Sequence, residues 1–343
     1  MLSMGIKSFS GRIIADISVF EQMTTPGKWL WEDIGNYYGA TPSGLSVYEN
    51  ILKLKFTTGA EGSKAILSET IPTTELQLDI QLFAANTGTD NGWFYGDPQT
   101  QARTVRGTIP SNRTEFVLKA SLPNPEKVVS NMLISSLVNN GIACKVTTEI
   151  WQTEIDVSEC RLLSTIKSAP LNKIAQAANY RSVNLYADHL FLQLGKQKYG
   201  VGSFDTGAKV VYNYFKDKNL PFEGLQLYDG SGLAAFNSIS SNQLTSFLTA
   251  MYAEPGFQEY LATIPLAGDT AGTMRRFDNK VLRFAELHAK SGSMTGVLTY
   301  SGYIYNTKNE MLAFSLFFNK SNISANELRN IANEVFIQLA ESN

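Results

Sequence analysis

A lysine, two hydroxyls and a glycine stand together at Lys290-Ser-Gly-Ser293, in front of an alternating strand pattern. Attack on an amide carbonyl needs an activated hydroxyl, donors for the developing oxyanion, and groups that hold the substrate. A strand edge with this segment can supply the last two. The Lys290 ammonium would face an anionic substrate end, and the Ser291 hydroxyl would bond a carboxylate. Gly292 would admit a substrate backbone, and the N–H of Ser293 would face an oxyanion.

Taken alone, this segment is better explained as an ordinary edge strand with a solvated lysine than as part of a catalytic site. A second motif, Ser182-Val-Asn184, lies between two helical patterns. Ser182 can offer a hydroxyl for proton relay, and Asn184 can offer an amide to a substrate carbonyl. The alternative is a helix break with local Ser and Asn caps. The two motifs together are more specific than either one.

The elements that must position these residues differ between the two halves of the chain. Residues 1–160 are rich in alternating apolar patterns and turn signals, which predict strands. One helix is expected in this half, over residues 125–137, with Asn124 as N-cap and Asn140-Gly141 closing it. The expected strands cover residues 11–20, 51–56, 76–82, 113–119 and 144–150.

Residues 161–343 combine helices with a hairpin. Ser240 with Gln243 and Ser324 with Glu327 are capping boxes, each opening a helix. Other helices are expected over residues 171–181, 185–194 and 208–218, and strands over residues 297–305 and 311–318. The whole pattern predicts a multi-domain α+β fold with a boundary between residues 160 and 161.

Composition excludes several classes of protein. A net charge of −2 over 343 residues gives no electrostatic support for a nucleic-acid partner. No apolar run is long enough for a transmembrane segment, and no signal peptide opens the chain. Two isolated histidines and two cysteines outside any Cys-x-x-Cys indicate no metal site and no cofactor. Cys144 and Cys160 are expected as buried thiols, with a disulfide between strand neighbours as the alternative.

Several longer stretches resemble the D-alanyl-D-alanine carboxypeptidase/endopeptidase family, the class C low-molecular-mass penicillin-binding proteins. The resemblance runs from near the N-terminus to the C-terminus. It is carried by residues 11–20, Trp29-Leu-Trp-Glu-Asp33, Tyr38-Gly-Ala-Thr-Pro42, Tyr228-Asp-Gly-Ser-Gly-Leu233, Ile264-Pro-Leu-Ala-Gly268 and Ala289-Lys-Ser-Gly-Ser-Met-Thr-Gly-Val297.

The resemblance implies a transpeptidase domain of the penicillin-binding-protein/β-lactamase type with a β-rich inserted domain. It implies serine-type hydrolysis of peptidoglycan stem peptides, β-lactam binding, and a periplasmic or cell-envelope location. Ser182 would resemble the proton-relay serine and Asn184 the substrate-orienting amide, with Lys290 and Ser291 gripping the carboxylate. Asp229 is expected to shape a loop near the site. Ser291 stands where the family usually has Thr, which keeps the hydroxyl.

The family nucleophile belongs to a Ser-x-x-Lys motif at the start of a helix. Ser164-Thr-Ile-Lys167 matches this motif as text, but Pro170 disfavours helix at the residue before it. We therefore interpret Ser164 as a decoy and expect this chain to lack the family's N-terminal region with the nucleophile. Two functions stay open: an enzyme of this family, and an inactive remnant or peptidoglycan-binding protein of the same fold.

Overall fold

The computed structural model describes residues 5–23, 25–277 and 286–342. The chain forms two compact units, each assembled from three segments. The first unit comprises Met1–Lys167, Asp188–Ala208 and Tyr228–Phe236, and the second comprises Ser168–Ala187, Lys209–Leu227 and Asn237–Asn343. The boundary between residues 160 and 161 stays a prediction.

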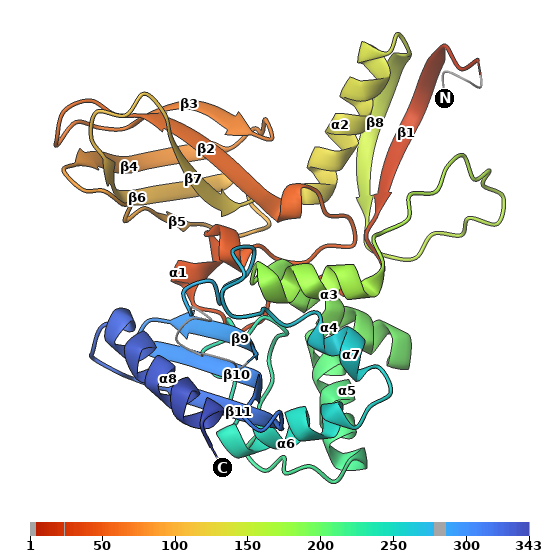
Figure 1. Ribbon diagram of the computed structural model, residues 1–343. Helices are drawn as coiled ribbons and strands as arrows, with labels where there is room; N and C mark the ends of the chain where they lie inside the picture. The colour runs from red at the N-terminus through yellow and green to blue at the C-terminus, as the bar shows by residue number, and fades with distance from the viewer. Residues whose placement is uncertain (1–4, 24, 278–285, 343) are drawn as a thin grey trace. The chain divides into compact units, whose positions relative to one another are not determined.

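Two three-stranded sheets enclose the main core of the first unit (Figure 1). One has the order β3-β2-β7 and is antiparallel, and the other has the order β4-β6-β5 with β4 parallel to β6. Leu52, Leu54 and Phe56 are completely buried, so the alternation predicted over residues 51–56 is confirmed. The strands are β2 (Ile51–Thr57), β3 (Ile66–Ile71), β4 (Gln77–Ala85), β5 (Trp93–Tyr95), β6 (Ala102–Pro110) and β7 (Phe116–Ser121).

A second layer of the first unit pairs the parallel strands β1 (Ser8–Asp16) and β8 (Ala143–Trp151) with helix α2 (Pro125–Asn139) (Figure 1). The strand predicted over residues 11–20 is displaced along the chain, since β1 begins at Ser8 and ends at Asp16. The chain turns after Asp16, whose side chain accepts a hydrogen bond from Ser18 N. The helix predicted over residues 125–137 is confirmed. Short helical segments lie between β1 and β2 in the chain, at α1 (Trp31–Ile34), η2 (Tyr37–Gly39) and η3 (Tyr48–Asn50).

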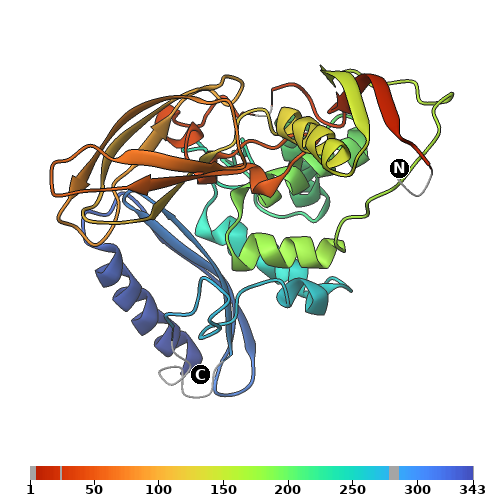
Figure 2. The same cartoon turned by 90° about the horizontal axis from the view of Figure 1, so that it is seen from above.

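The second unit contains an antiparallel sheet of order β11-β10-β9. Its strands are β9 (Leu287–Met294), β10 (Val297–Tyr305) and β11 (Met311–Phe318). Helix α8 (Ala325–Ala340) covers one face of this sheet (Figure 2). On that face Phe336 packs against Tyr300 and Phe314. Helix α6 (Ser241–Tyr252) covers the opposite face, beside Tyr303. Both predicted capping boxes and both strands of the predicted hairpin are confirmed.

The remaining helices are α3 (Leu171–Tyr180), α4 (Asn184–Tyr199), α5 (Phe204–Asp217) and α7 (Phe257–Leu261). Helices α4 and α5 each begin in one compact unit and end in the other. None of the helices in the described ranges is long and apolar enough to cross a membrane.

Both cysteine thiols are free. Cys144 is partly buried, but Cys160 is exposed, so the expectation of two buried thiols was wrong for Cys160. Cys160 lies after the end of β8 and closes an exposed turn, in which its N–H donates to Val157 O at 2.9 Å. Within the described residues, no three His, Cys, Asp or Glu side chains come together in a way that could hold a metal ion.

Candidate active site

Strand β9 carries the predicted lysine motif and presents its side chains alternately to the two faces of the sheet. Leu287 and Ala289 pack in the core beneath α8, so Ser291 and Ser293 point toward the same face. Lys290 points the opposite way, and its ammonium donates a hydrogen bond of 2.9 Å to Ser182 Oγ. It also donates to the carbonyl oxygen of Ser291. The second unit therefore brings the two sequence motifs into direct contact.

Ser182 reaches Lys290 because of how helix α3 ends. Ser182 has φ 53°, the left-handed conformation that usually belongs to glycine after a helix. The N–H of Val183 donates to Ala178 O at 3.1 Å, which closes the last turn as a Schellman motif. The helix itself is held by Asn179, whose amide donates to Thr263 Oγ1 at 3.1 Å. A serine in this strained position keeps its hydroxyl directed at Lys290.

Burial changes the acid–base behaviour of Lys290. Loss of solvation lowers the pKa of the Lys290 ammonium to about 8. A lysine with this pKa is still mostly charged at pH 7, but it gives up a proton far more readily than a solvated lysine. The pair Lys290–Ser182 can therefore act both as a fixed positive charge and as a short path for a proton.

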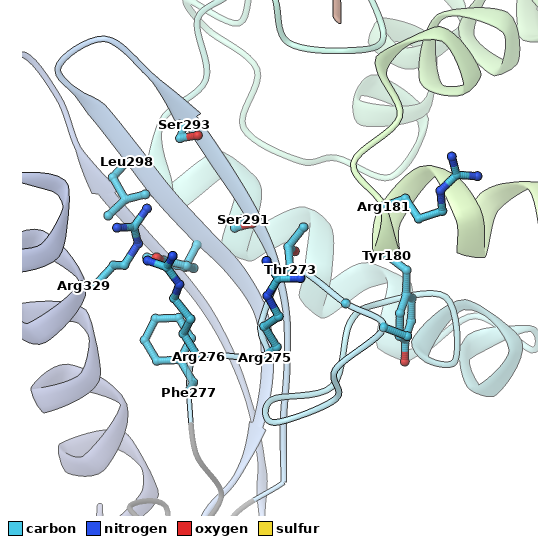
Figure 3. Close-up of a pocket in the computed structure, with 13 residues that line it drawn as sticks. Tyr180, Arg181, Thr273, Arg275, Arg276, Phe277, Ser291, Ser293, Leu298 and Arg329 are labelled. Carbon is cyan, nitrogen blue, oxygen red and sulfur yellow. The ribbon is translucent and has the colours of Figure 1, made fainter. Parts of the chain in front are cut away.

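Ser291 and Ser293 border a cavity of about 420 Å³ in the second unit (Figure 3). Four arginines line it, and none of its described lining residues is acidic. Burial raises the pKa of the Tyr300 hydroxyl, and the positive charge of Arg329 opposes this shift. The cavity is thus suited to an anion. Its lining comprises Tyr180, Arg181, Ala271, Gly272, Thr273, Arg275, Arg276, Phe277, Ser291, Ser293, Leu298, Tyr300 and Arg329.

The other predicted site residues lie on the same elements. Gly292 is on β9 opposite Thr299, and a Cβ added to Gly292 would meet only Thr299 Oγ1, at 2.7 Å. The remaining space beside Gly292 is open to a ligand backbone. Asn184 is the first residue of α4 and is partly buried. Neither residue belongs to the described lining of the arginine cavity.

Ser164 lies in a different environment from all of these residues. It belongs to an extended, solvent-exposed stretch between β8 and α3, and Lys167 is exposed as well. Helix α3 begins only at Leu171, directly after Pro170. Ser164 and Lys167 therefore do not share the first turns of a helix, which is the arrangement that an activated Ser-x-x-Lys needs.

The loop that carries Asp229 is held within the first unit by two buried carboxylates. Asp229 accepts hydrogen bonds from Gly232 N at 2.9 Å and from Trp29 Nε1 at 2.8 Å, so it shapes the loop, as expected. Asp188 accepts from Gly230 N at 2.8 Å and from Ser231 N at 2.9 Å. Asp188 is completely buried, and burial together with the nearby Asp229 charge raises its pKa well above the ordinary value.

Sequence reasoning missed Asp188 and the arginines of the cavity. Asp188 lies one helical turn after Asn184, and a carboxylate inside an otherwise apolar helix face was its only signal. Arg275-Arg276 forms a basic pair that precedes β9, but Arg181 and Arg329 come from distant segments. No local pattern shows that these segments meet.

Comparison with known proteins assigns the sequence to a family. The sequence matches the D-Ala-D-Ala carboxypeptidase 3 (S13) family over residues 2–341. The D-alanyl-D-alanine carboxypeptidase of Actinomadura sp. (strain R39) is 25% identical over 323 residues, which cover 91% of this chain and 60% of that relative. The D-alanyl-D-alanine carboxypeptidase DacB of Haemophilus influenzae is 23% identical over 327 residues, 92% of this chain and 66% of the relative.

The fold is also found in a solved structure. The crystal structure of penicillin binding protein 4 (dacB) from Haemophilus influenzae matches with a TM-score of 0.84 at 21% identity, covering 99% of this chain and 77% of that chain. The likeness confirms the predicted multi-domain α+β fold of the penicillin-binding-protein type. The chain spans 60% and 66% of the length of the two curated relatives. By its match over nearly all of its residues, the chain belongs to the D-Ala-D-Ala carboxypeptidase 3 (S13) family.

Proposed function

We propose that this chain provides the substrate-binding wall of a serine-type D-alanyl-D-alanine carboxypeptidase/endopeptidase that acts on peptidoglycan peptides in the periplasm or cell envelope. The observation that carries the proposal is the 2.9 Å hydrogen bond from Lys290 Nζ to Ser182 Oγ. Lys290 lies on β9, the strand whose Ser291 and Ser293 border the arginine cavity. The relatives named D-alanyl-D-alanine carboxypeptidase support it. A second crystal structure of penicillin binding protein 4 from Haemophilus influenzae, which has a similar fold, contains a bound β-lactam and also supports the proposal.

The arginine cavity would take the carboxylate at the end of the peptide. The hydroxyl of Ser291 would donate to one carboxylate oxygen, and an arginine can hold the pair of oxygens through two parallel hydrogen bonds. Lys290 adds a positive charge across the same strand. Such a cavity distinguishes a peptide that ends in a free carboxylate from an internal peptide segment.

The residues around Lys290 would serve the reacting bond. When a serine oxygen attacks the penultimate D-alanine carbonyl carbon, the C–N bond breaks and the leaving nitrogen needs a proton. Ser182 would donate that proton and recover one from Lys290, whose pKa of about 8 makes the transfer easier. The N–H of Ser293 would stabilise the oxyanion, and the Asn184 amide would hold a substrate carbonyl.

The attacking serine is not supplied by Ser164 in this proposal. Ser164-Thr-Ile-Lys167 is the one Ser-x-x-Lys in the sequence, and it lies exposed and outside any helix. This observation favours a second candidate function, a peptidoglycan-binding protein that holds the peptide without turnover. Release of D-alanine from a peptide substrate would separate the two functions.

Titration with diacetyl-L-lysyl-D-alanyl-D-alanine, followed by NMR of the labelled protein, tests the binding wall. We expect Arg276→Ala to weaken binding by about tenfold, because it removes a charge-assisted contact to the carboxylate. Lys290→Ala should weaken binding by a smaller factor, because Lys290 lies on the other face of the strand and acts on the carboxylate only through its charge. Arg161→Ala is the matched control, since Arg161 is exposed and lies outside the cavity. Unchanged binding in both site variants, or equal loss in the control, would contradict the proposal.

A further inference from the structure

A second cavity, of about 350 Å³, lies wholly within the first unit and shares no residue with the arginine cavity. Two of its aromatic side chains remain exposed to solvent, Tyr37 at 49% and Trp93 at 37%. Its floor is apolar, with Phe94 and Leu118 both buried. The lining comprises Asn36, Tyr37, Tyr38, Asp90, Asn91, Gly92, Trp93, Phe94, Val117, Leu118 and Lys119.

The two aromatic walls are fixed relative to each other by a buried amide. Asn36 is 4% exposed, and its Oδ1 accepts a hydrogen bond from Phe94 N at 3.2 Å. Its Nδ2 donates to Glu32 O at 2.6 Å. Gly35 lets the chains approach this closely, since a Cβ there would lie 2.1 Å from Phe94 O. The segment with Tyr37 is therefore clamped to the strand with Trp93, and the cavity is formed before any ligand arrives.

The rim of the cavity is polar and has no net charge. It carries one carboxylate, Asp90, one amide, Asn91, and one ammonium, Lys119. The indole N–H of Trp93 donates to Asn91 Oδ1 at 3.1 Å, which orients the ring. Lys119 Nζ lies 5.7 Å from the centroid of the Tyr37 ring. Hydrogen-bond donors and acceptors of both charges thus surround the two exposed aromatic side chains.

We infer that this cavity binds a neutral oligosaccharide. A sugar ring offers an apolar C–H face that can pack on Tyr37 and Trp93, while its hydroxyls require the mixed donors and acceptors of Asp90, Asn91 and Lys119. A charged ligand would gain no net attraction from this rim. That the sugar is N-acetylated, as in the glycan of peptidoglycan, rests on the proposed function, whereas carbohydrate binding rests on the cavity alone.

Calorimetric titration with tri-N-acetylchitotriose tests the inference. Trp93→Ala and Tyr37→Ala should each weaken binding by roughly tenfold, because each removes one stacking face. Trp31→Ala is the matched control, since Trp31 is 59% exposed in α1 and lies outside the cavity. All three side chains are exposed, so their removal should leave the fold intact, and the far-ultraviolet circular dichroism of each variant checks this.

Binding that is lost in the two cavity variants and kept in Trp31→Ala would support the inference. No saturable binding below about 10 mM, or equal loss in the control, would overturn it. Saturable binding of tetra-alanine in place of the sugar would assign the cavity to a peptide and also overturn it. Because the D-alanyl-D-alanine titration uses residues of the second unit, Trp93→Ala should leave that titration unchanged, so the two proposals fail independently.

Discussion

Replacing Ser182 by glycine and by alanine separates the conformational cost of this residue from its hydrogen bond. Ser182 has φ 53°, and its hydroxyl accepts the hydrogen bond from Lys290 at 2.9 Å. Both variants lose that bond. Only glycine also removes the clash between Cβ and backbone in the left-handed conformation.

The expected difference between the two variants follows from opposing effects. Relief of the left-handed conformation stabilises the glycine variant by roughly 1–2 kcal/mol. The more flexible unfolded chain takes back about 0.4–1 kcal/mol. Ser182→Gly should therefore be about 1 kcal/mol more stable than Ser182→Ala, which corresponds to a melting temperature about 1–2 °C higher for a chain of 343 residues. Against the native chain, loss of the bond costs about 0.5–1.5 kcal/mol, because the buried Lys290 ammonium loses one partner and keeps its hydrogen bond to Ser291 O.

Differential scanning calorimetry of the native chain and both variants measures these differences, and peptide titration measures function. Ser182→Gly should unfold close to the native melting temperature, because relief of the left-handed conformation and loss of the hydrogen bond are of similar size. Both variants should still bind the D-alanyl-D-alanine peptide, since the proposed role of Ser182 is to move a proton. A glycine variant less stable than the alanine variant would refute the reasoning about the end of α3.

Three further predictions follow from the charged groups and from Ser164. Peptide binding should weaken as pH rises from 6.5 to 9, because Lys290 loses its positive charge around its pKa of about 8. NMR titrations at both pH values measure this. Binding that does not change with pH would show that the charge of Lys290 does not contribute to carboxylate binding. Since the pKa of buried Asp188 is raised, the folded state holds that proton, and this contribution to stability is lost as pH rises from about 4 toward the raised pKa. Urea unfolding at pH 5 and pH 8 should therefore show that Asp188→Asn gains stability relative to the native chain at the higher pH, and parallel pH dependences would contradict this. Incubation with a β-lactam should give no covalent adduct on Ser164 by intact-mass and peptide mass spectrometry, and a stoichiometric adduct there would overturn its interpretation as a decoy.

The local patterns in the sequence predicted those elements that local physics decides. The strands over residues 297–305 and 311–318 alternate over their full length, and the boxes opened by Ser240 and Ser324 satisfy their helix ends within four residues. By contrast, strand β6 was not predicted. Arg103, Arg106 and Gly107 interrupt its apolar pattern, and its pairing with β4 is set by the rest of the sheet.

The candidate site was predictable only in part, for the same reason. Ser182 and Lys290 each belong to a short motif that can be recognised in the sequence, so the two motifs together predict that these residues lie in one site. The arginine cavity could not, because Arg181, Arg276 and Arg329 come from a helix end, a loop and the C-terminal helix. Likewise, the pKa of Asp188 depends on a loop about 40 residues away, whose backbone closes over the carboxylate.

The central claim is that the wall formed by Lys290, Ser291 and the arginine cavity recognises a free carboxylate at the end of a D-alanyl-D-alanine peptide. The most direct test compares diacetyl-L-lysyl-D-alanyl-D-alanine with its C-terminal amide in NMR titrations of this chain. The two ligands differ only in that charge. We predict that the amide binds at least about tenfold more weakly and that it leaves the resonances of Ser291 and Arg276 in place. Equal binding of the acid and the amide would contradict the account.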